Sequence, residues 1–211
     1  MIELFLSAFT TLFVVIDPPG CAPIYAGLTK EASDKERRSM AIRAVIIATV
    51  ILLVFALFGE ALLGALHIEL DAFRIAGGLM LFLIALDMVF EKRTQRREER
   101  AERILAESEG SRETEDVSVF PMAMPMLAGP GAITSVMLLN ARADGLEESL
   151  AVLAAFAAVM LITLAALLAA APLMRLAGKR VEAVITRLLG VLLAALAAQF
   201  VINGLRGSFG I

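Results

Sequence analysis

The sequence predicts an all-α membrane protein with six transmembrane helices in two inverted three-helix repeats, the first and fourth helices being broken within the membrane. Three observations predict this fold. Apolar residues make up 59% of the chain, against roughly 45–50% in soluble domains. Charged residues gather in three windows and leave apolar stretches of about 20 residues, the length of a membrane-crossing helix. Two Pro/Gly motifs, at 17–20 and 128–131, interrupt two of these stretches at matching positions.

Six stretches have the length and composition of a membrane span. They cover residues 2–28, 44–66, 71–90, 119–140, 149–173 and 186–205. The second stretch carries Glu60 as its only charge, and residues 150–174 carry none. A soluble protein could bury one such helix, but six of them in 211 residues would leave too little polar surface to keep the chain in water.

The basic residues predict the orientation of these spans, because loops on the cytoplasmic side carry an excess of Lys and Arg. Sixteen of the 19 basic residues fall in the windows 30–43, 91–116 and 175–187. Only Arg74, Arg142 and Arg206 fall on the opposite side of the membrane. We therefore expect these three windows in the cytoplasm and both chain termini on the outer side.

The chain divides into a first repeat at 1–90, a charged cytoplasmic linker at 91–118 and a second repeat at 119–211. We expect the linker to be a solvated connection. The alternative is a regulatory or lipid-binding role, because basic segments beside a membrane attract anionic lipid. Each half has three spans, so the second half enters the membrane upside down relative to the first. Inverted repeats of this kind are common among secondary transporters.

Two short patterns recur in the two halves in the same order. Pro19-Gly20 matches Pro130-Gly131 at an offset of 111, and Arg74-Ile-Ala-Gly77 resembles Arg187-Leu-Leu-Gly190 at an offset of 113. Each match is short, but the nearly constant offset agrees with the repeat that the span count predicts. Interrupted spans at corresponding places of two repeats indicate the binding site of a transporter.

The two motifs predict helices that stop and restart inside the membrane. Proline lacks a backbone N–H, and glycine permits backbone angles that other residues resist. The residues concerned are Pro18, Pro19 and Gly20 in the first motif and Gly129, Pro130 and Gly131 in the second. A restarting helix presents free N–H groups and the positive end of its dipole, which together receive an anion such as a carboxylate. We expect two such starts to face each other near the middle of the membrane.

Asp17 immediately precedes the first restart and has two interpretations. It could cap the helix at 18–28 by accepting hydrogen bonds from its free N–H groups. It could instead bind a substrate ammonium group or carry a coupling proton, because carboxylates within a membrane are costly and usually functional. One carboxylate could do both. Because Ala128 occupies the matching place in the second motif, the expected site is asymmetric and suits a zwitterion.

Other polar side chains near the breaks complete the candidate substrate site. They are Thr10, Thr11, Cys21, Thr134, Ser135, Gln199 and Asn203. The alternative role of the hydroxyl groups is to satisfy the backbone at a kink, and that of Gln199 and Asn203 is hydrogen bonding between helices. Asp87, near the cytoplasmic end of the third span, is a second candidate for coupling. With His67 and Cys21 the only residues of their types, we expect no metal, cofactor or enzymatic activity.

Three segments of the chain resemble a known family. They are FTTLFVVIDPPGCAPIY at 9–25, RIAGGLMLFLIALDMVF at 74–90 and PMAMPMLAGPGAIT at 121–134. The sequence resembles, over nearly its whole length, the MarC family of bacterial and archaeal inner-membrane proteins, also called the neutral amino acid transporter family. The resemblance implies six spans in a LysE-like architecture. For at least some members it also implies transport of small neutral amino acids such as glycine or alanine. A family role for the break residues would fall on Asp17, Pro18, Pro19, Gly20, Gly129, Pro130, Gly131 and Thr134.

We therefore expect a secondary transporter of the inner membrane that carries a small neutral amino acid and uses a proton or sodium ion for coupling. Membrane lipid is an expected partner, and nucleic acid is not. Two alternatives remain: a passive channel between facing half-helices, and a non-transporting scaffold that acts through the linker. Saturable uptake would separate a carrier from a channel. Deleting the linker would separate a carrier, which should keep its flux, from a scaffold.

Overall fold

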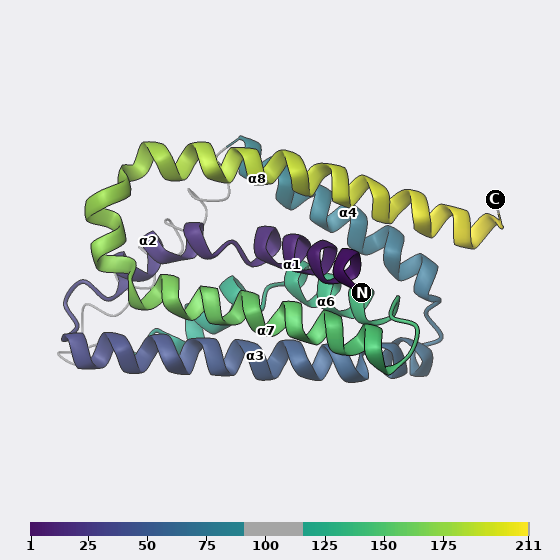
Figure 1. The fold of residues 1–211 in the computed structure, drawn as a ribbon, viewed down its shortest axis with the longest axis horizontal. Coiled ribbons are helices and arrows are strands. Elements are labelled where there is room, and N and C mark those ends of the chain that lie inside the picture. The colour runs from purple at the N-terminus through teal and green to yellow at the C-terminus, as the bar shows by residue number, and fades with distance from the viewer. Residues whose placement is uncertain (91–115, 211) are drawn as a thin grey trace.

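The computed structural model describes residues 1–90 and 116–210, and within these residues the only regular structure is helical (Figure 1). The predicted linker thus lies almost wholly outside the described residues. The helices are α1 (Ile2–Ile16), α2 (Pro18–Leu28), α3 (Asp34–Ala65), α4 (Leu70–Val89), η1 (Ser118–Leu127), α6 (Pro130–Asn140), α7 (Leu146–Leu168) and α8 (Ala170–Phe209). The prediction of an all-α protein is confirmed.

Five stretches of the described chain are long and apolar enough to cross a membrane, and η1 with α6 makes a sixth if this bent pair counts as one span. These stretches match the predicted spans, with two differences. α3 and α8 begin before the predicted spans: the first residues of α3, 34–39, are all polar, and α8 begins at Ala170 although the part of it that could cross a membrane is Thr186–Phe209. The predicted fifth span runs past the end of α7, because Ala and Leu continue unchanged through the junction at Ala169.

The helices of one half of the chain pack mainly against helices of the other half. α1 lies against α7, and η1 and α6 lie against α3. α2 contacts α8, just as α6 contacts α4. Each of these contacts has a counterpart when the two halves are exchanged. The halves therefore interlock and share one core.

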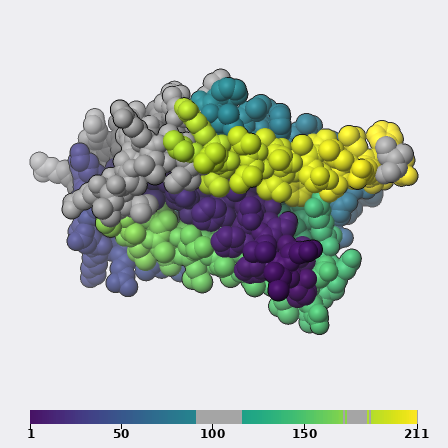
Figure 2. Space-filling view, turned by 45° about the horizontal axis from the view of Figure 1, so that its top comes forward, coloured from purple at the N-terminus to yellow at the C-terminus, as the bar shows by residue number. Residues whose placement is uncertain are grey.

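Among the described helices, α4 and α8 make the most extensive contact and run antiparallel (Figure 1). Figure 2 shows them side by side on the surface of the molecule. A Cβ atom added to Gly78 would lie 2.8 Å from the carbonyl oxygen of Ala197, and one added to Gly190 would lie 3.1 Å from the carbonyl oxygen of Ala85. The two contacts correspond, because Gly190 lies 112 residues after Gly78 and Ala197 lies 112 residues after Ala85. The inverted repeat predicted from the sequence would produce such an exchange. The structural match to Gly190 is therefore Gly78, one residue beyond the Gly77 matched by sequence.

We expect Gly78→Val and Gly190→Val to destabilise the protein by similar amounts, each by about 1–3 kcal/mol. The added atoms would meet a backbone carbonyl, which cannot turn aside as a flexible side chain can. Thermal unfolding can be followed with a thiol-reactive dye, because Cys21 is the single cysteine and is buried.

The matched control for these variants is Gly64→Val, since a Cβ at Gly64 meets nothing within 4 Å. A melting temperature for Gly78→Val or Gly190→Val equal to that of Gly64→Val would contradict close packing of α4 on α8.

Candidate functional site

The first break lies at Asp17, which ends α1 and begins α2. Its backbone takes a left-handed conformation, with φ 59° and ψ 63°, which Asp and Asn adopt more readily than other non-glycine residues. The Gly20 N–H donates to Asp17 Oδ1 at 3.1 Å, and the Cys21 N–H donates to the Asp17 carbonyl at 3.0 Å. The side chain of Asp17 is buried. The structure thus shows the cap that the sequence suggested.

This cap leaves the start of α2 without a free donor in its first turn. Pro18 and Pro19 have no N–H, and Gly20 gives its N–H to Asp17. A Cβ added to Gly20 would lie 2.2 Å from the carboxylate, so the residue is held tightly against its cap. The prediction that both restarts offer free N–H groups is therefore wrong for α2. A side chain that accepts from the first turn replaces the anion that the helix start would otherwise receive.

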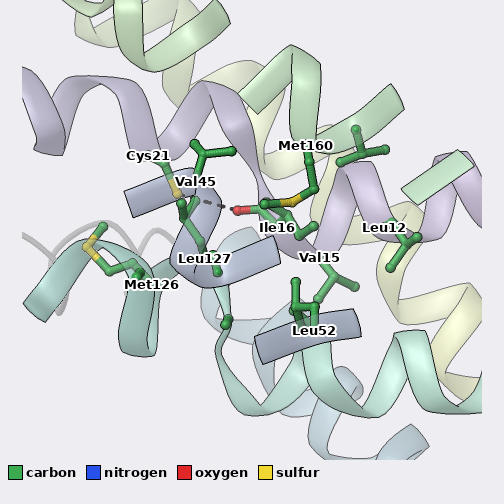
Figure 3. Close-up of a cluster of buried hydrophobic side chains, with 14 of the residues drawn as sticks. Leu12, Val15, Ile16, Cys21, Val45, Leu52, Met126, Leu127 and Met160 are labelled. Carbon is green, nitrogen blue, oxygen red and sulfur yellow. Dashed lines mark hydrogen bonds between the residues drawn. The ribbon is translucent and has the colours of Figure 1, made fainter. Parts of the chain in front are cut away.

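The first break is also enclosed by apolar side chains, as Figure 3 shows around Ile16 and Cys21. Leu127 of η1 and Met160 of α7 lie beside it and are buried. The thiol of Cys21 donates to the Ile16 carbonyl at 3.4 Å, so Cys21 satisfies the backbone at the break.

The second break differs in shape, because η1 and α6 meet at an angle of 55°. η1 is a π-type segment in which Phe120 and Met124 are extended, with φ of −129° and −132°. These residues precede Pro121 and Pro125, and a residue before proline is driven out of the helical region. The sequence predicted a span at 119–140 with its break at 128–131, and the two prolines add extended residues before that break.

The start of α6 keeps free donors. Gly129 is its extended N-terminal cap, provides no side chain, and is followed by Pro130. The Ile133 N–H donates to the Gly129 carbonyl at 3.0 Å, which closes the first turn. The N–H groups of Gly131 and Ala132 precede that bond and have no acceptor within the helix. In the part of the chain that the structure describes, this is the broken helix whose start stays open.

A cavity of about 150 Å³ adjoins the start of α6. Its walls come from α1, α4, η1 and α6, and the lining residues are Val15, Ile84, Pro125, Met126, Gly129, Pro130, Gly131 and Ala132. A Cβ added to Gly131 would lie 2.7 Å from Ile84 Cδ1 and 3.3 Å from Val15 Cγ1. The absence of a side chain at 131 thus preserves the space beside the free N–H groups. An apolar pocket with a few convergent polar groups is the usual form of a small-molecule site.

The other predicted site residues do not line this cavity. Thr11 and Ser135 are buried, and Ser135 Oγ has no hydrogen-bond partner among the described residues. Thr134 packs on Gly77, where an added Cβ would lie 2.1 Å from its methyl group. Thr10 is exposed on α1 and does not line the cavity.

Gln199 and Asn203 are not brought to the break. The Gln199 amide donates to Asn203 Oδ1 at 2.8 Å within α8, and Gln199 is exposed. The hydrogen bond between helices that the sequence suggested for this pair is therefore replaced by one along a single helix. Asp87 is half-buried on α4 and is likewise absent from the cavity lining.

The polar groups at the predicted outer side form a separate cluster. Arg74 pairs with Asp71 at 2.6 Å, so its partner is a neighbour on α4. The Arg142 guanidinium lies over the Phe200 ring, 4.7 Å from its centroid. Burial lowers the pKa of Arg142, and the positive charge of Arg74 lowers it further. This cluster joins the α6–α7 connection to α8 at one end of the molecule.

Sequence reasoning missed the cavity residues Val15, Ile84, Pro125, Met126 and Ala132. Each is an apolar residue in an apolar span, and no local signal separates a pocket wall from a lipid-facing or core position. Gly129, Pro130 and Gly131 were found because proline and glycine reveal a break directly.

Comparisons with known proteins extend over the whole chain. A family model described as MarC family integral membrane protein matches residues 2–209. A UPF0056 membrane protein of Methanocaldococcus jannaschii is 38% identical, with 98% of each chain covered. The UPF0056 membrane protein YvbG of Bacillus subtilis is 34% identical over 99% of this chain and 97% of its own. The UPF0056 inner membrane protein YhgN of Escherichia coli is 30% identical over 95% of both. No solved structure gives a significant match.

Proposed function

The chain belongs to the MarC family of integral membrane proteins, and from this premise we propose that it is a secondary transporter of small neutral amino acids. The observation that carries the proposal is the cavity of about 150 Å³ at the open start of α6. It combines free backbone donors, the positive end of a helix dipole and apolar walls. A break inside a membrane span is tolerated only where protein or water covers its backbone, so this break has a structural cost that a binding site explains.

The polar groups of the cavity match the two ends of a zwitterion. A substrate carboxylate would accept from the N–H groups of Gly131 and Ala132 at the start of α6, where the helix dipole favours negative charge. Pro125 also lines the cavity. In a π-type turn a carbonyl accepts from the N–H group five residues later. For the Pro125 carbonyl that residue is Pro130, which has no N–H. That carbonyl would accept from the substrate ammonium group.

The size of the cavity favours a small substrate. An engineered apolar cavity of about 150 Å³ binds benzene, which has six non-hydrogen atoms. Alanine also has six and glycine has five, whereas leucine and phenylalanine need more room. The apolar walls formed by Val15 and Ile84 would accept a methyl side chain and would leave a charged one unpaired. We therefore propose glycine, alanine and similarly small neutral amino acids as substrates.

Alternating access would follow from movement of one half of the chain against the other. Inverted repeats commonly rock around a site near the midplane, and the exchangeable contacts of α4 with α8 support such a repeat here. We propose an inner-membrane location with the basic loops in the cytoplasm and both termini outside. Asp17 and Asp87 are the candidates for coupling to a proton or sodium ion.

The test is uptake of radiolabelled glycine and alanine into proteoliposomes under a proton or a sodium gradient. We expect uptake to saturate and unlabelled serine to inhibit it. Leucine and phenylalanine should inhibit at least about tenfold less well than serine. That ratio corresponds to a difference of about 1.4 kcal/mol in binding. Flux that does not saturate would indicate a channel. No uptake by well-folded protein under either gradient would contradict amino acid transport and favour a scaffold.

A further inference from the structure

A second and larger cavity, of about 370 Å³, lies at the other end of α2. The end of α2 at Leu28, the start of α3 at Asp34 and the end of α7 at Leu168 all fall at or beside this cavity. Two apolar spans thus end here and a third begins with polar residues. The cavity is therefore at the depth where hydrocarbon gives way to lipid headgroups, on the side that the basic loops predict to be cytoplasmic.

The lining of this cavity has an apolar and a polar side. The apolar residues are Ala26, Leu167, Leu168, Ala170 and Pro172, and the polar ones are Tyr25, Thr29, Asp34, Arg37 and Arg38. Leu168 is 45% exposed, so the apolar side continues onto the surface that faces lipid. A lining of this kind fits a ligand with a charged head and an apolar tail.

Hydrogen bonds hold the polar side in place. The Thr29 hydroxyl donates to the Tyr25 carbonyl at 2.7 Å, and the Tyr25 hydroxyl donates to the Arg37 carbonyl. Ser33 and Glu36 cap the start of α3 reciprocally. The backbone that carries Arg38 is therefore fixed by bonds from α2 and from its own cap, and little further ordering is needed to place a ligand beside it.

The charges of the cavity differ in their partners. Arg37 pairs with Asp34. No acidic side chain among the described residues pairs with Arg38, which is exposed at the cavity. A guanidinium binds phosphate oxygens through two parallel hydrogen bonds, which makes arginine the preferred partner of a phosphate. Within the part of the chain that the structure describes, Arg38 is thus an available cation next to an apolar wall.

We propose that this cavity binds the headgroup phosphate of an anionic phospholipid from the adjoining leaflet. Arg38 holds the phosphate, and one acyl chain lies along Leu167 and Leu168 toward the bilayer. Basic pockets between membrane helices on the cytoplasmic side bind anionic headgroups in this way. The proposal requires only that the chain spans a membrane and does not depend on what the protein transports.

The test measures melting temperature in detergent with the buried Cys21 as the reporter. Phosphatidylglycerol, phosphatidylcholine with the same acyl chains, and soluble glycerol phosphate are added separately. We expect phosphatidylglycerol to raise the melting temperature of wild type more than phosphatidylcholine does, and Arg38→Gln to lose at least half of that difference. Lys35→Gln, an exposed residue in the first turns of α3 that does not line the cavity, should keep it.

A second variant tests the apolar side. Leu168→Gln should weaken the effect of phosphatidylglycerol while Arg38 remains intact, and native mass spectrometry should count fewer bound phosphatidylglycerol molecules for both variants. Equal lipid shifts in wild type and Arg38→Gln would overturn the proposal. A shift from glycerol phosphate as large as that from the lipid would also overturn it, because the site would then be one for a free phosphate.

Discussion

Gly131→Leu is expected to abolish saturable uptake of glycine and alanine, with a loss of at least about tenfold in uptake rate, or about 1.4 kcal/mol. Position 131 borders the cavity, and even a Cβ there would lie 2.7 Å from Ile84 Cδ1. A leucine side chain would fill the space beside the N–H groups of Gly131 and Ala132 and would separate them from a substrate carboxylate. The measurement is radiolabelled uptake into proteoliposomes, with protein amount and melting temperature measured in parallel.

The matched control is Gly27→Leu in α2, because Gly27 is exposed and an added Cβ meets nothing within 4 Å. It should keep uptake near the wild-type level. A milder pair of variants separates blocking from misfolding. Gly131→Ala should weaken uptake, and adding Ile84→Val, which removes the atom nearest the new Cβ, should restore part of it. Full activity in folded Gly131→Leu would show that the substrate does not bind at this break.

Asp17→Ala is expected to lower the free energy of unfolding by about 2–3 kcal/mol, whereas Asp17→Asn should change it by less than about 0.5 kcal/mol. Alanine loses the cap, which costs about 1 kcal/mol, and must adopt the left-handed backbone, which costs about 1–2 kcal/mol. Asparagine keeps an oxygen that accepts from the Gly20 N–H and tolerates the positive φ of 59°. Melting of the two variants in the same detergent is the measurement.

The asparagine variant then isolates the charge of Asp17. Because it should fold like wild type, any change in its uptake reports on the carboxylate itself. Loss of the response to a proton gradient, with exchange of labelled for unlabelled alanine retained, would identify Asp17 as a coupling residue. Equal instability of Asp17→Asn and Asp17→Ala would contradict the capping role, because the charge and not the hydrogen bond would then support the break.

Sequence alone identified the spans, the two breaks and the family resemblance. These features depend on local chemistry: a long apolar run crosses a bilayer as a helix, and Pro18 or Pro130 interrupts it because proline lacks an N–H. The cap at Asp17 was also accessible, since its partner is only three residues away. Such features can be predicted from the sequence because the interacting groups are neighbours in the chain.

The tertiary structure decided which break is open and what surrounds it. The start of α2 is closed by its own cap, while the start of α6 adjoins a cavity whose walls include Val15 of α1 and Ile84 of α4. The tertiary structure also makes Gly78, and not Gly77, the counterpart of Gly190 in the other half, and it leaves Gln199 exposed. These outcomes depend on which face each helix turns toward its neighbours. In a membrane protein the lipid-facing side is as apolar as the interior, so hydrophobicity does not mark the buried face, and only packing between distant segments determines it.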